Sequence, residues 1–416
     1  MEPKDQIGLR RANLAHVLEV LRVHGPHSRA GIARLTGLNK ATSSSLVAEL
    51  TDRGLVRLGS PATGQFGRPG HLVELRPGTV CGIGLEVNVD YAAVAVLDVA
   101  GTLVRHRRVA RDLVALGPDG AVDLLGELAS AEIAALRADD AWVAGVSVAV
   151  PGLIDVSAGV VRLAPNLGWR EVPLAARLAE RIGLVPGVDN DANHSALAEH
   201  AAGVAAGTPD LLYLTGEVGV GGGVISGGSL LRGATGFTGE VGHMPLDPAG
   251  ERCGCGRIGC WETSVGLAAL LRGVAGDDDP VRDPALDLEQ RLTLIAGRAR
   301  AGDARTLAAL HRIGSALGVG ASILVNVLNP AVVVLGGYFA VLGRWLLGPA
   351  REELCARVLA PGPAGCELVL SDLGFTAAVR GGAHAALDAV LTDPTTAPSR
   401  SATAVRQAPE QHRSTS

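Results

Sequence analysis

Residues 239–243 read Gly-Glu-Val-Gly-His, and residues 253–262 read Cys-Gly-Cys-Gly-Arg-Ile-Gly-Cys-Trp-Glu. One histidine and three cysteines thus follow the pattern His-x9-Cys-x-Cys-x4-Cys, with candidate ligands His243, Cys253, Cys255 and Cys260. Four such ligands complete the tetrahedral shell of Zn²⁺, and a shell without an open position is typical of a structural site. The alternative, three unligated loop cysteines beside a histidine, explains the spacing poorly. The pattern therefore predicts a structural zinc site within residues 239–262.

The same loop carries two carboxylates and an imidazole, on Glu240, Glu262 and His243. A bound metal would hold these three side chains toward one cavity. Carboxylates placed in this way suit bidentate hydrogen bonds to sugar hydroxyls, and a site built from such groups rejects analogues that lack the hydroxyl. The loop is therefore expected to face a sugar-binding cavity.

The chain around this loop alternates between apolar strands and helices. Residues 81–98 read as a strand, a tight turn and a returning strand, and residues 142–150 read as a buried strand. Further apolar strands are expected at residues 210–214, 222–225 and 331–335. This alternation predicts an α/β fold, in which ligands gather at strand ends.

Two more clusters could carry chemistry. Val188-Asp-Asn-Asp-Ala-Asn193 precedes a helix expected over residues 192–205. Its Asn190 and Asp191 could bind a polyol, or Asp191 could act as a base toward a hydroxyl, but a plain N-cap cluster explains them equally well. Glu217-Val-Gly-Val-Gly-Gly-Gly-Val-Ile225 is a glycine run within a strand pair. Its glycines fit either a close backbone approach to a phosphate or an ordinary hairpin turn.

Residues 1–76 have the pattern of a winged helix-turn-helix. Apolar residues from Leu14 to Leu21 recur at helical spacing, Ser28 is expected to cap a second helix that ends at Gly37, and Asn39 is expected to cap a third. Two strands, at residues 55–58 and 71–75, would flank a basic wing at residues 64–70. Contacts with double-stranded DNA are expected from the caps, the leading edge of the third helix and the wing, namely from Ser28, Arg29, Asn39, Lys40, Thr42, Ser43, Ser44 and Arg68. The alternative is a small helical interaction domain, which the complete order of elements disfavours.

Charge and aromatic content agree with a DNA-binding end. Residues 1–76 carry 11 Lys and Arg against 6 Asp and Glu, whereas the remainder carries 26 against 36. A basic segment on an acidic body fits a polyanion that one end alone contacts. Four Trp, three Tyr and four Phe in 416 residues offer no platform for stacking single-stranded bases.

Cysteine usage and hydropathy predict a cytoplasmic protein. Three of the six cysteines lie within residues 253–260, which suits a reducing compartment and a metal site. No signal-peptide pattern follows Met1. Residues 313–343 lack charged side chains, but Asn326, Asn329 and Pro330 interrupt them, so a buried helix and strand are expected and not a membrane span. Residues 393–416 are rich in Ser, Thr, Pro, Ala and Gln and are expected to form a disordered tail.

Taken together, the zinc segment and the string Asn190-Asp-Ala-Asn193 resemble the ROK family, named for repressors, open reading frames and sugar kinases. The resemblance runs from the first helix to about residue 392 and is strongest to the branch typified by xylose repressors. It implies a winged helix-turn-helix at residues 1–76, followed at residues 79–392 by a two-lobed actin/hexokinase-like (ribonuclease H-like) sugar-kinase fold. It also implies zinc on the four ligands above, and a sugar site lined by Asn166, Asn190, Asp191, Glu240, His243 and Glu262. In kinase members the residue matching Asp191 is the catalytic base.

The sequence departs from the kinase pattern where phosphates bind. Kinase members carry Asp-x-Gly-Gly-Thr on the first hairpin, and this chain reads Glu86-Val-Asn-Val there. They carry Gly-Thr before the second glycine run, where Glu217-Val218 stand here. A carboxylate at that position would repel a triphosphate, and valine offers no hydroxyl. The glycine pairs at 336–337 and 381–382 match nucleotide-side turns, but such turns also serve packing. We therefore expect no enzymatic activity.

The sequence thus predicts a sugar-responsive DNA-binding regulator, a repressor of carbohydrate uptake or catabolism genes. A sugar or sugar derivative in the cleft would shift the body between conformations, and in a homodimer or tetramer that shift would change half-site spacing on an operator. The first alternative is an ATP-dependent sugar kinase with an accessory DNA-binding domain. The second is a zinc-stabilised scaffold that binds neither sugar nor DNA.

Overall fold

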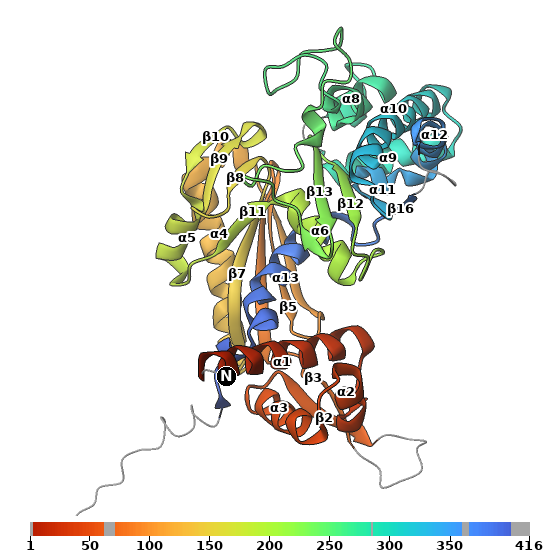
Figure 1. The fold of residues 1–416 in the computed structure, drawn as a ribbon. Helices are drawn as coiled ribbons and strands as arrows, with labels where there is room; N and C mark the ends of the chain where they lie inside the picture. Colours follow the sequence, from red (N-terminus) through yellow and green to blue (C-terminus); the bar gives the residue numbers. More distant parts are fainter. Residues whose placement is uncertain (1–2, 62–70, 284–285, 360–365, 401–416) are drawn as a thin grey trace, which may run out of the picture.

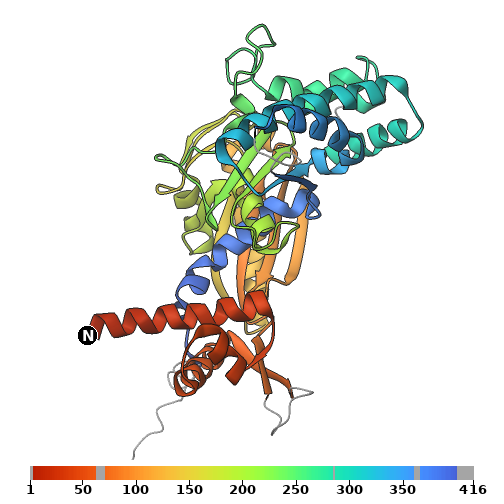
Figure 2. The ribbon, with the colours of Figure 1, turned by 45° about the vertical axis from the view of Figure 1, so that its right-hand side comes forward.

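The structure is a computed structural model that describes residues 3–61, 71–283, 286–359 and 366–400. An elongated body of two lobes stands on a small N-terminal domain, and the long first helix lies across the junction between them (Figures 1 and 2).

The N-terminal domain has the predicted helix-turn-helix order, and its local sequence explains where each helix begins and ends. The hydroxyl of Ser28 accepts a hydrogen bond from the Gly31 amide, and the Asn39 side chain accepts one from the Thr42 amide. Gly37 ends the second helix at φ 70°, a conformation that favours glycine. The predicted wing, residues 64–70 with Arg68, lies outside the described residues. The elements are α1 (Pro3–His24), β1 (His27–Ser28), α2 (Arg29–Thr36), α3 (Lys40–Asp52), β2 (Val56–Pro61) and β3 (His71–Leu75), with sheet order β1-β3-β2.

The first lobe is built on a five-stranded sheet with the order β11-β7-β4-β5-β6. Its first three strands along the chain form an antiparallel meander, and β7 and β11 run parallel to β4. The strands are β4 (Val80–Val87), β5 (Tyr91–Asp98), β6 (Leu103–Ala110), β7 (Trp142–Val150) and β11 (Gly187–Asn190). The helix α4 (Leu113–Ala138) packs on the sheet with α5 (Leu174–Ile182) behind it, and α13 (Ala377–Thr392) packs on β4, β5 and β7 (Figure 1). A small sheet of β8 (Leu153–Asp155), β9 (Val160–Ala164) and β10 (Trp169–Val172) lies beside it.

The second lobe repeats this topology, because the order β16-β15-β12-β13-β14 places the same hairpin and parallel strands in the same positions. On β12, Leu211 and Tyr213 face α6, whereas Leu212 and Leu214 join the core of the outer helices. The strands are β12 (Leu211–Gly216), β13 (Val220–Ser226), β14 (Ser229–Leu230), β15 (Val332–Gly337) and β16 (Glu367–Leu370). The helices are α6 (Asp191–Ala202) on one face and α7 (Glu262–Val265), α8 (Leu267–Val274), α9 (Leu288–Arg300), α10 (Ala304–Leu328), α11 (Tyr338–Val341) and α12 (Gly343–Arg357) on the other. The predicted two-lobed actin/hexokinase-like fold is confirmed.

The helices α6 and α13 pack against each other where the two lobes meet. A Cβ atom on Gly381 would lie 1.7 Å from the His194 carbonyl oxygen, so the two helices approach as closely as glycine allows. On its other side, α13 packs so near the sheet that a Cβ on Gly84 would lie 1.9 Å from the Val379 carbonyl oxygen. The pair Gly381-Gly382 therefore serves helix packing.

The C-terminal end of α13 joins the body to the winged helix. Leu387 and Val390 belong to the same apolar cluster as Leu14 of α1 and Leu50 of α3, so the two domains share a continuous core. The expected disorder after residue 392 is wrong for residues 393–400. Pro394–Thr396 form a 3-10 turn and Ala397 is fully buried, while residues 401–416 lie outside the described residues.

The uncharged stretch forms a buried helix and a buried strand, as predicted. Within the described residues, α10 is the one helix long and apolar enough to cross a bilayer, but 61% of its most apolar window is buried. It packs against α12 and α8, and β15 is buried throughout.

Candidate functional site: a polar cleft between the lobes

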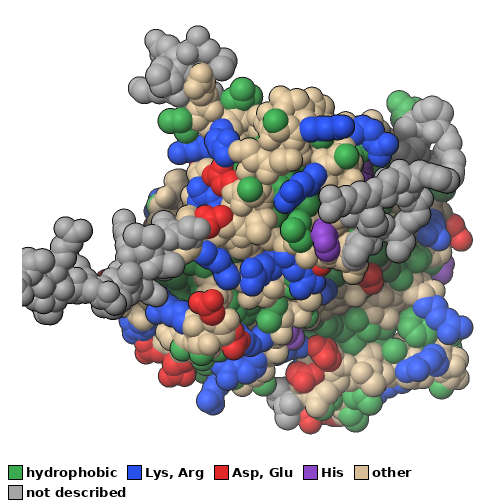
Figure 3. All heavy atoms as spheres, turned by 90° about the horizontal axis from the view of Figure 1, so that it is seen from below, with side chains coloured by type: hydrophobic (Ala, Val, Ile, Leu, Met, Phe, Trp, Pro, Cys, Tyr) green, Lys and Arg blue, Asp and Glu red, His purple; other side chains and the backbone are tan. Residues whose placement is uncertain are grey.

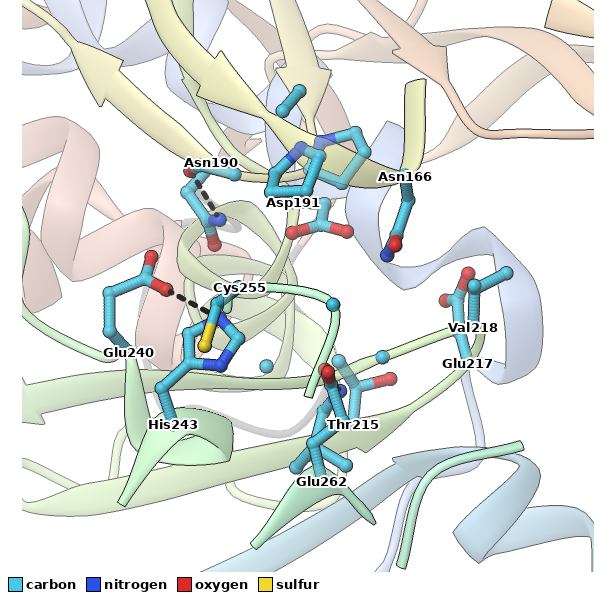
Figure 4. A pocket seen from close by; sticks show the side chains of 18 of the residues that line it. Asn166, Asn190, Asp191, Thr215, Glu217, Val218, Glu240, His243, Cys255 and Glu262 are labelled. Carbon is cyan, nitrogen blue, oxygen red and sulfur yellow. Dashed lines mark hydrogen bonds and ion pairs between the residues drawn. The ribbon is translucent and has the colours of Figure 1, made fainter. Parts of the chain in front are cut away.

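The cleft lies between the two sheets and is lined by strand ends and loops from both lobes (Figure 4). All six residues expected at a sugar site line it, and their side chains converge on one space: Asn166, Asn190, Asp191, Glu240, His243 and Glu262. Asn166 comes from the short 3-10 turn Pro165–Leu167, and the other five come from the β11–α6 junction and the loop after β14. The sequence did not single out Asn88 and Thr215, which also line the cleft.

The β11–α6 junction forms the N-cap that the sequence allowed, and it also borders the cleft. The Asn190 side-chain oxygen accepts hydrogen bonds from the Ala192 and Asn193 amides, and its nitrogen donates to the Gly152 carbonyl. Asn190 therefore caps α6 while it lines the cleft. Asp191 accepts one hydrogen bond from the Ala192 amide, and burial raises the pKa of its carboxyl to about 6. A carboxyl with this pKa near neutrality can accept a proton from a ligand hydroxyl or share one with it.

The loop after β14 brings Glu240, His243 and Glu262 to the opposite wall. Glu262 begins α7, and its Oε2 accepts a hydrogen bond from the Val220 amide at 3.2 Å. Burial, and after it repulsion by Asp191 and Glu262, raises the pKa of Glu240 to about 7. The Oε2 atom of Glu240 lies 3.8 Å from Nε2 of His243. This wall therefore presents two carboxyl groups and one imidazole to the cleft (Figure 4).

His243, Cys253, Cys255 and Cys260 come together into one cluster that could hold a metal ion. Their ligand atoms all lie within 4.8 Å of one another. The Cys255 and Cys260 sulfurs are 3.6 Å apart, and the Cys253 sulfur is 3.7 Å from Nδ1 of His243. Zinc bonds of about 2.3 Å to sulfur and about 2.0 Å to nitrogen give tetrahedral edges of roughly 3.6–3.8 Å, so these separations fit a zinc ion. Metal-bound histidines usually donate their second ring N–H to a carboxylate, and here Nε2 faces Glu240.

Two hairpin turns at equivalent positions of the two sheets meet at the cleft. The turn between β4 and β5 carries Asn88, and the turn between β12 and β13 carries Glu217. The Asn88 amide donates a hydrogen bond to Oε2 of Glu217, which ties the lobes together. Burial, and after it repulsion by Asp191, raises the pKa of Glu217 to about 7.

Behind the first turn, Glu86 is buried within the lobe and does not line the cleft. The Tyr91 hydroxyl donates a hydrogen bond to Oε1 of Glu86, and Oε2 of Glu86 has no hydrogen-bond partner among the described residues. Burial, and after it repulsion by Glu217, raises the pKa of Glu86 to about 8. The two departures from the kinase pattern are therefore different in kind, because Glu217 faces the ligand space and Glu86 supports the turn from behind.

The glycine run of β13 is explained by packing. A Cβ on Gly223 would lie 2.4 Å from the Ala192 carbonyl oxygen of α6, and one on Gly222 would lie 2.8 Å from Val241. A Cβ on Gly219 would lie 2.6 Å from Oε2 of Glu262. The run lets β13 approach both walls of the cleft. Packing against protein is therefore the role that these contacts show, and it is neither of the two readings from sequence.

The expected DNA contacts lie on the winged helix at the far end of the molecule, where Figure 3 shows Lys and Arg side chains spread over the face seen from below. Arg29, Asn39 and Lys40 are exposed, and Ser28, Thr42 and Ser44 are half-buried. Ser43 is a correction: its side chain is fully buried and its hydroxyl donates to the Arg29 carbonyl, so it holds α2 against α3 and is not on the exposed edge. The neighbouring Ser45 is exposed instead.

Comparison with known proteins agrees with this architecture. The model of the ROK family matches residues 82–389, and that of the MarR family matches residues 8–65. The chain is 31% identical over 392 residues to the xylose repressor of Bacillus subtilis (strain 168), an alignment that covers 94% of this chain and 99% of that relative.

Two solved structures extend the comparison. The crystal structure of a ROK family transcriptional regulator, described as a homolog of the E. coli MLC protein, superposes with a TM-score of 0.75 over 92% of this chain and 97% of its own; at 23% identity this shows the fold alone. A ROK family glucokinase from Streptomyces griseus, in complex with glucose and AMPPNP, is 28% identical with a TM-score of 0.62 and covers 74% of this chain and 99% of its own.

Proposed function

The chain belongs to the ROK family, and from this premise we propose that it is a sugar-responsive DNA-binding repressor of carbohydrate uptake or catabolism genes. The observation that carries the proposal is the Glu217 side chain, which faces the cleft and accepts a hydrogen bond from Asn88 on the opposite lobe. The polar groups for a sugar are kept, while a carboxylate and a valine stand on the hairpin that would hold a triphosphate. The cleft is thus suited to bind a sugar without phosphorylating it.

The sugar would be held by Asn166, Asn190, Asp191, Glu240, His243 and Glu262. Asp191 would accept a hydrogen bond from a ligand hydroxyl in the position that serves a kinase as its base. A structural Zn²⁺ ion would be bound by His243 together with Cys253, Cys255 and Cys260, and the spacing of these four ligand atoms supports this assignment. The ion would hold the wall that carries Glu240 and Glu262 in place.

The operator would be double-stranded DNA bound by a homodimer or tetramer in the cytoplasm. In this arrangement α3 would enter the major groove, with Arg29, Asn39, Lys40, Thr42 and Ser44 near bases and phosphates, Ser28 at the start of α2, and Arg68 on the wing. Residues 1–76 would be the DNA-binding domain and residues 79–392 the effector domain, and residues 393–400 would dock the second onto the first.

A continuous path links the cleft to the DNA-binding helices. The helix α6 begins at the cleft with Asp191 and packs along α13, which leads into residues 393–400. There Arg53 at the end of α3 donates hydrogen bonds to the carbonyls of Thr395 (3.0 Å) and Ala397 (2.5 Å), and Arg11 of α1 pairs with Asp393 at 3.3 Å. A ligand that moves α6 against α13 would therefore move the DNA-binding domain.

The experiment that tests the proposal is a sugar panel read by thermal shift, followed by a gel shift with promoter DNA upstream of the gene. A sugar that raises Tm and also changes operator affinity is expected. The proposal would be contradicted if no sugar raised the Tm, or if the sugar that binds left the affinity for DNA unchanged.

A sugar kinase with an accessory DNA-binding domain is the second candidate, and the retained Asp191 with its pKa of about 6 favours it. The discriminating assay supplies ATP, Mg²⁺ and each sugar, and follows ADP release. If the wild-type chain phosphorylates a sugar and Asp191→Asn does not, the kinase function would be accepted and the repressor function rejected.

A further inference from the structure

The charge of the cleft lining restricts the chemical class of its ligand. Four carboxyl groups line the cleft, on Asp191, Glu217, Glu240 and Glu262, whereas among the described residues no lysine or arginine lines it. The Nδ1 atom of His243 is turned toward the Cys253 sulfur, so this imidazole would carry no positive charge of its own when it ligates a metal. An anionic ligand would find no counter-charge in this lining.

Two arginines outside the lining, Arg232 and Arg108, are engaged by carboxylates. Arg232 forms an ion pair with the buried Asp189 of β11. Arg108 lies 3.8 Å over the ring of Tyr91 and pairs with Glu289. To reach an anion in the cleft, each side chain would have to leave a carboxylate partner.

Glu217 is placed where its charge would act on a substituent of the sugar hydroxyl that faces Asp191. A sugar ring held by Asn166, Asn190 and Glu262 would direct one hydroxyl toward Asp191, because Asp191 faces the centre of the cleft (Figure 4). Glu217 lies beyond it on the hairpin turn, fixed by Asn88. Above pH 7, where Asp191 and Glu217 are both ionised, a phosphate ester on that hydroxyl would place two further negative charges between two carboxylates. The site is partly shielded from water, so Coulomb repulsion there is strong.

We propose that the cleft selects an unphosphorylated sugar, neutral or bearing an amine, and rejects the phosphate ester of the same sugar, with Glu217 as the residue that sets this selectivity. The inference rests on the proposed function, since it specifies which sugars the same site accepts. It implies that the regulator responds to a sugar before any kinase has acted on it.

The test is isothermal titration of the full chain at about pH 8, above the pKa of Glu217, with matched pairs of sugars. The pairs are xylose and xylose 5-phosphate, glucose and glucose 6-phosphate, and N-acetylglucosamine and its 6-phosphate, with glucosamine as the cationic probe. The free sugar that binds is expected to bind at least about 100-fold more tightly than its phosphate ester, the order of effect produced by two nearby like charges. A phosphate ester that binds as tightly as the free sugar overturns the inference and leaves the proposed function intact. If neither member of any pair binds, the proposed function itself fails.

Two variants separate the role of Glu217 from a general charge effect. Glu217→Gln keeps a hydrogen-bond acceptor for Asn88 and removes the charge, and it is expected to narrow the discrimination at least about tenfold. The matched control, Glu180→Gln, removes an exposed carboxylate on α5, far from the lining, and is expected to keep the wild-type ratio. An unchanged ratio in Glu217→Gln, with the free sugar still bound, would overturn the assignment to this residue.

Discussion

Replacement of Arg53 by leucine is predicted to disconnect DNA binding from the sugar site. The Arg53 guanidinium pairs with Glu49 on its own helix and donates two hydrogen bonds to the carbonyls of Thr395 and Ala397. Its side chain is 17% exposed, so water screens these contacts little. Hydrogen bonds from a charged donor contribute about 1.5–3 kcal/mol each, and after the entropy of ordering the side chain is subtracted we expect a loss of about 2–4 kcal/mol in docking of the segment.

The expected loss of docking free energy is as large as the free energy that couples two sites in a typical regulator. Coupling between two sites on a regulator typically amounts to about 1–3 kcal/mol, or roughly 5–150-fold in affinity. A link weakened by a similar free energy should leave the ratio of operator affinities with and without sugar within about threefold of one. The fold should survive, because Leu387 and Val390 still pack into the shared core.

The assay is fluorescence anisotropy on labelled operator DNA, with and without the bound sugar, together with calorimetry for the sugar. Arg57→Leu is the matched control, since Arg57 is also an arginine of the DNA-binding domain and its guanidinium pairs with Glu74 within the β2–β3 hairpin. The coupling is a ratio within one variant, so a change in DNA affinity from either substitution cancels. Full wild-type coupling in Arg53→Leu, or an equal loss in Arg57→Leu, would refute the proposed path.

Three further outcomes are expected. Cys255→Ser should reduce bound zinc from one per chain to near zero by elemental analysis and lower Tm by roughly 5 °C or more, and unchanged metal content would refute the cluster. Gly223→Ala should destabilise the chain by about 1–3 kcal/mol in urea unfolding and weaken sugar binding, because its Cβ meets Ala192 of α6, whereas Gly297→Ala on open α9 surface should be neutral or stabilising. Glu86→Gln should flatten the pH dependence of the free energy of unfolding. The pKa of Glu86 rises from its usual 4.5 to about 8 on folding, so its contribution to that free energy is full below pH 4.5 and is lost toward pH 8. The slope between these pH values is up to about 1.4 kcal/mol per pH unit. Unfolding curves at pH 5, 6.5 and 8 that stay parallel between wild type and Glu86→Gln would contradict this.

The sequence predicted best the features that depend on neighbours along the chain. The caps Ser28 and Asn39 and the stop at Gly37 each depend on residues a few positions away, and the four candidate metal ligands lie within residues 243–260. The error at Ser43 was avoidable on the same grounds. Ser43 lies three and four residues before Leu46 and Val47, so helical periodicity already assigns it to the inner face.

Contacts between distant segments left no readable signal. Asn88 and Glu217 are 129 residues apart, and only the repeated sheet topology brings their two turns to one place. Residues 393–400 have the composition of a disordered segment, yet Arg53, more than 340 residues earlier, binds their carbonyls. The strands β6 and β16 were missed for another reason: β6 is a charged edge strand and β16 spans only four residues, so neither has a clear apolar pattern.

The packing of the glycine run explains how such a cleft can change its chemistry and keep its shape. If Gly221–Gly223 served only a close approach to a phosphate, they would have no role in a chain whose Glu217 repels phosphates at the adjacent turn. They instead bring β13 against Ala192 and Val241, and so set the width of the cleft whatever it binds. Shape therefore depends on backbone approach within β13, whereas charge depends on one side chain at the adjacent turn. Because the two properties lie on different residues, a carboxylate at position 217 can exclude phosphates without disturbing the walls that hold a sugar.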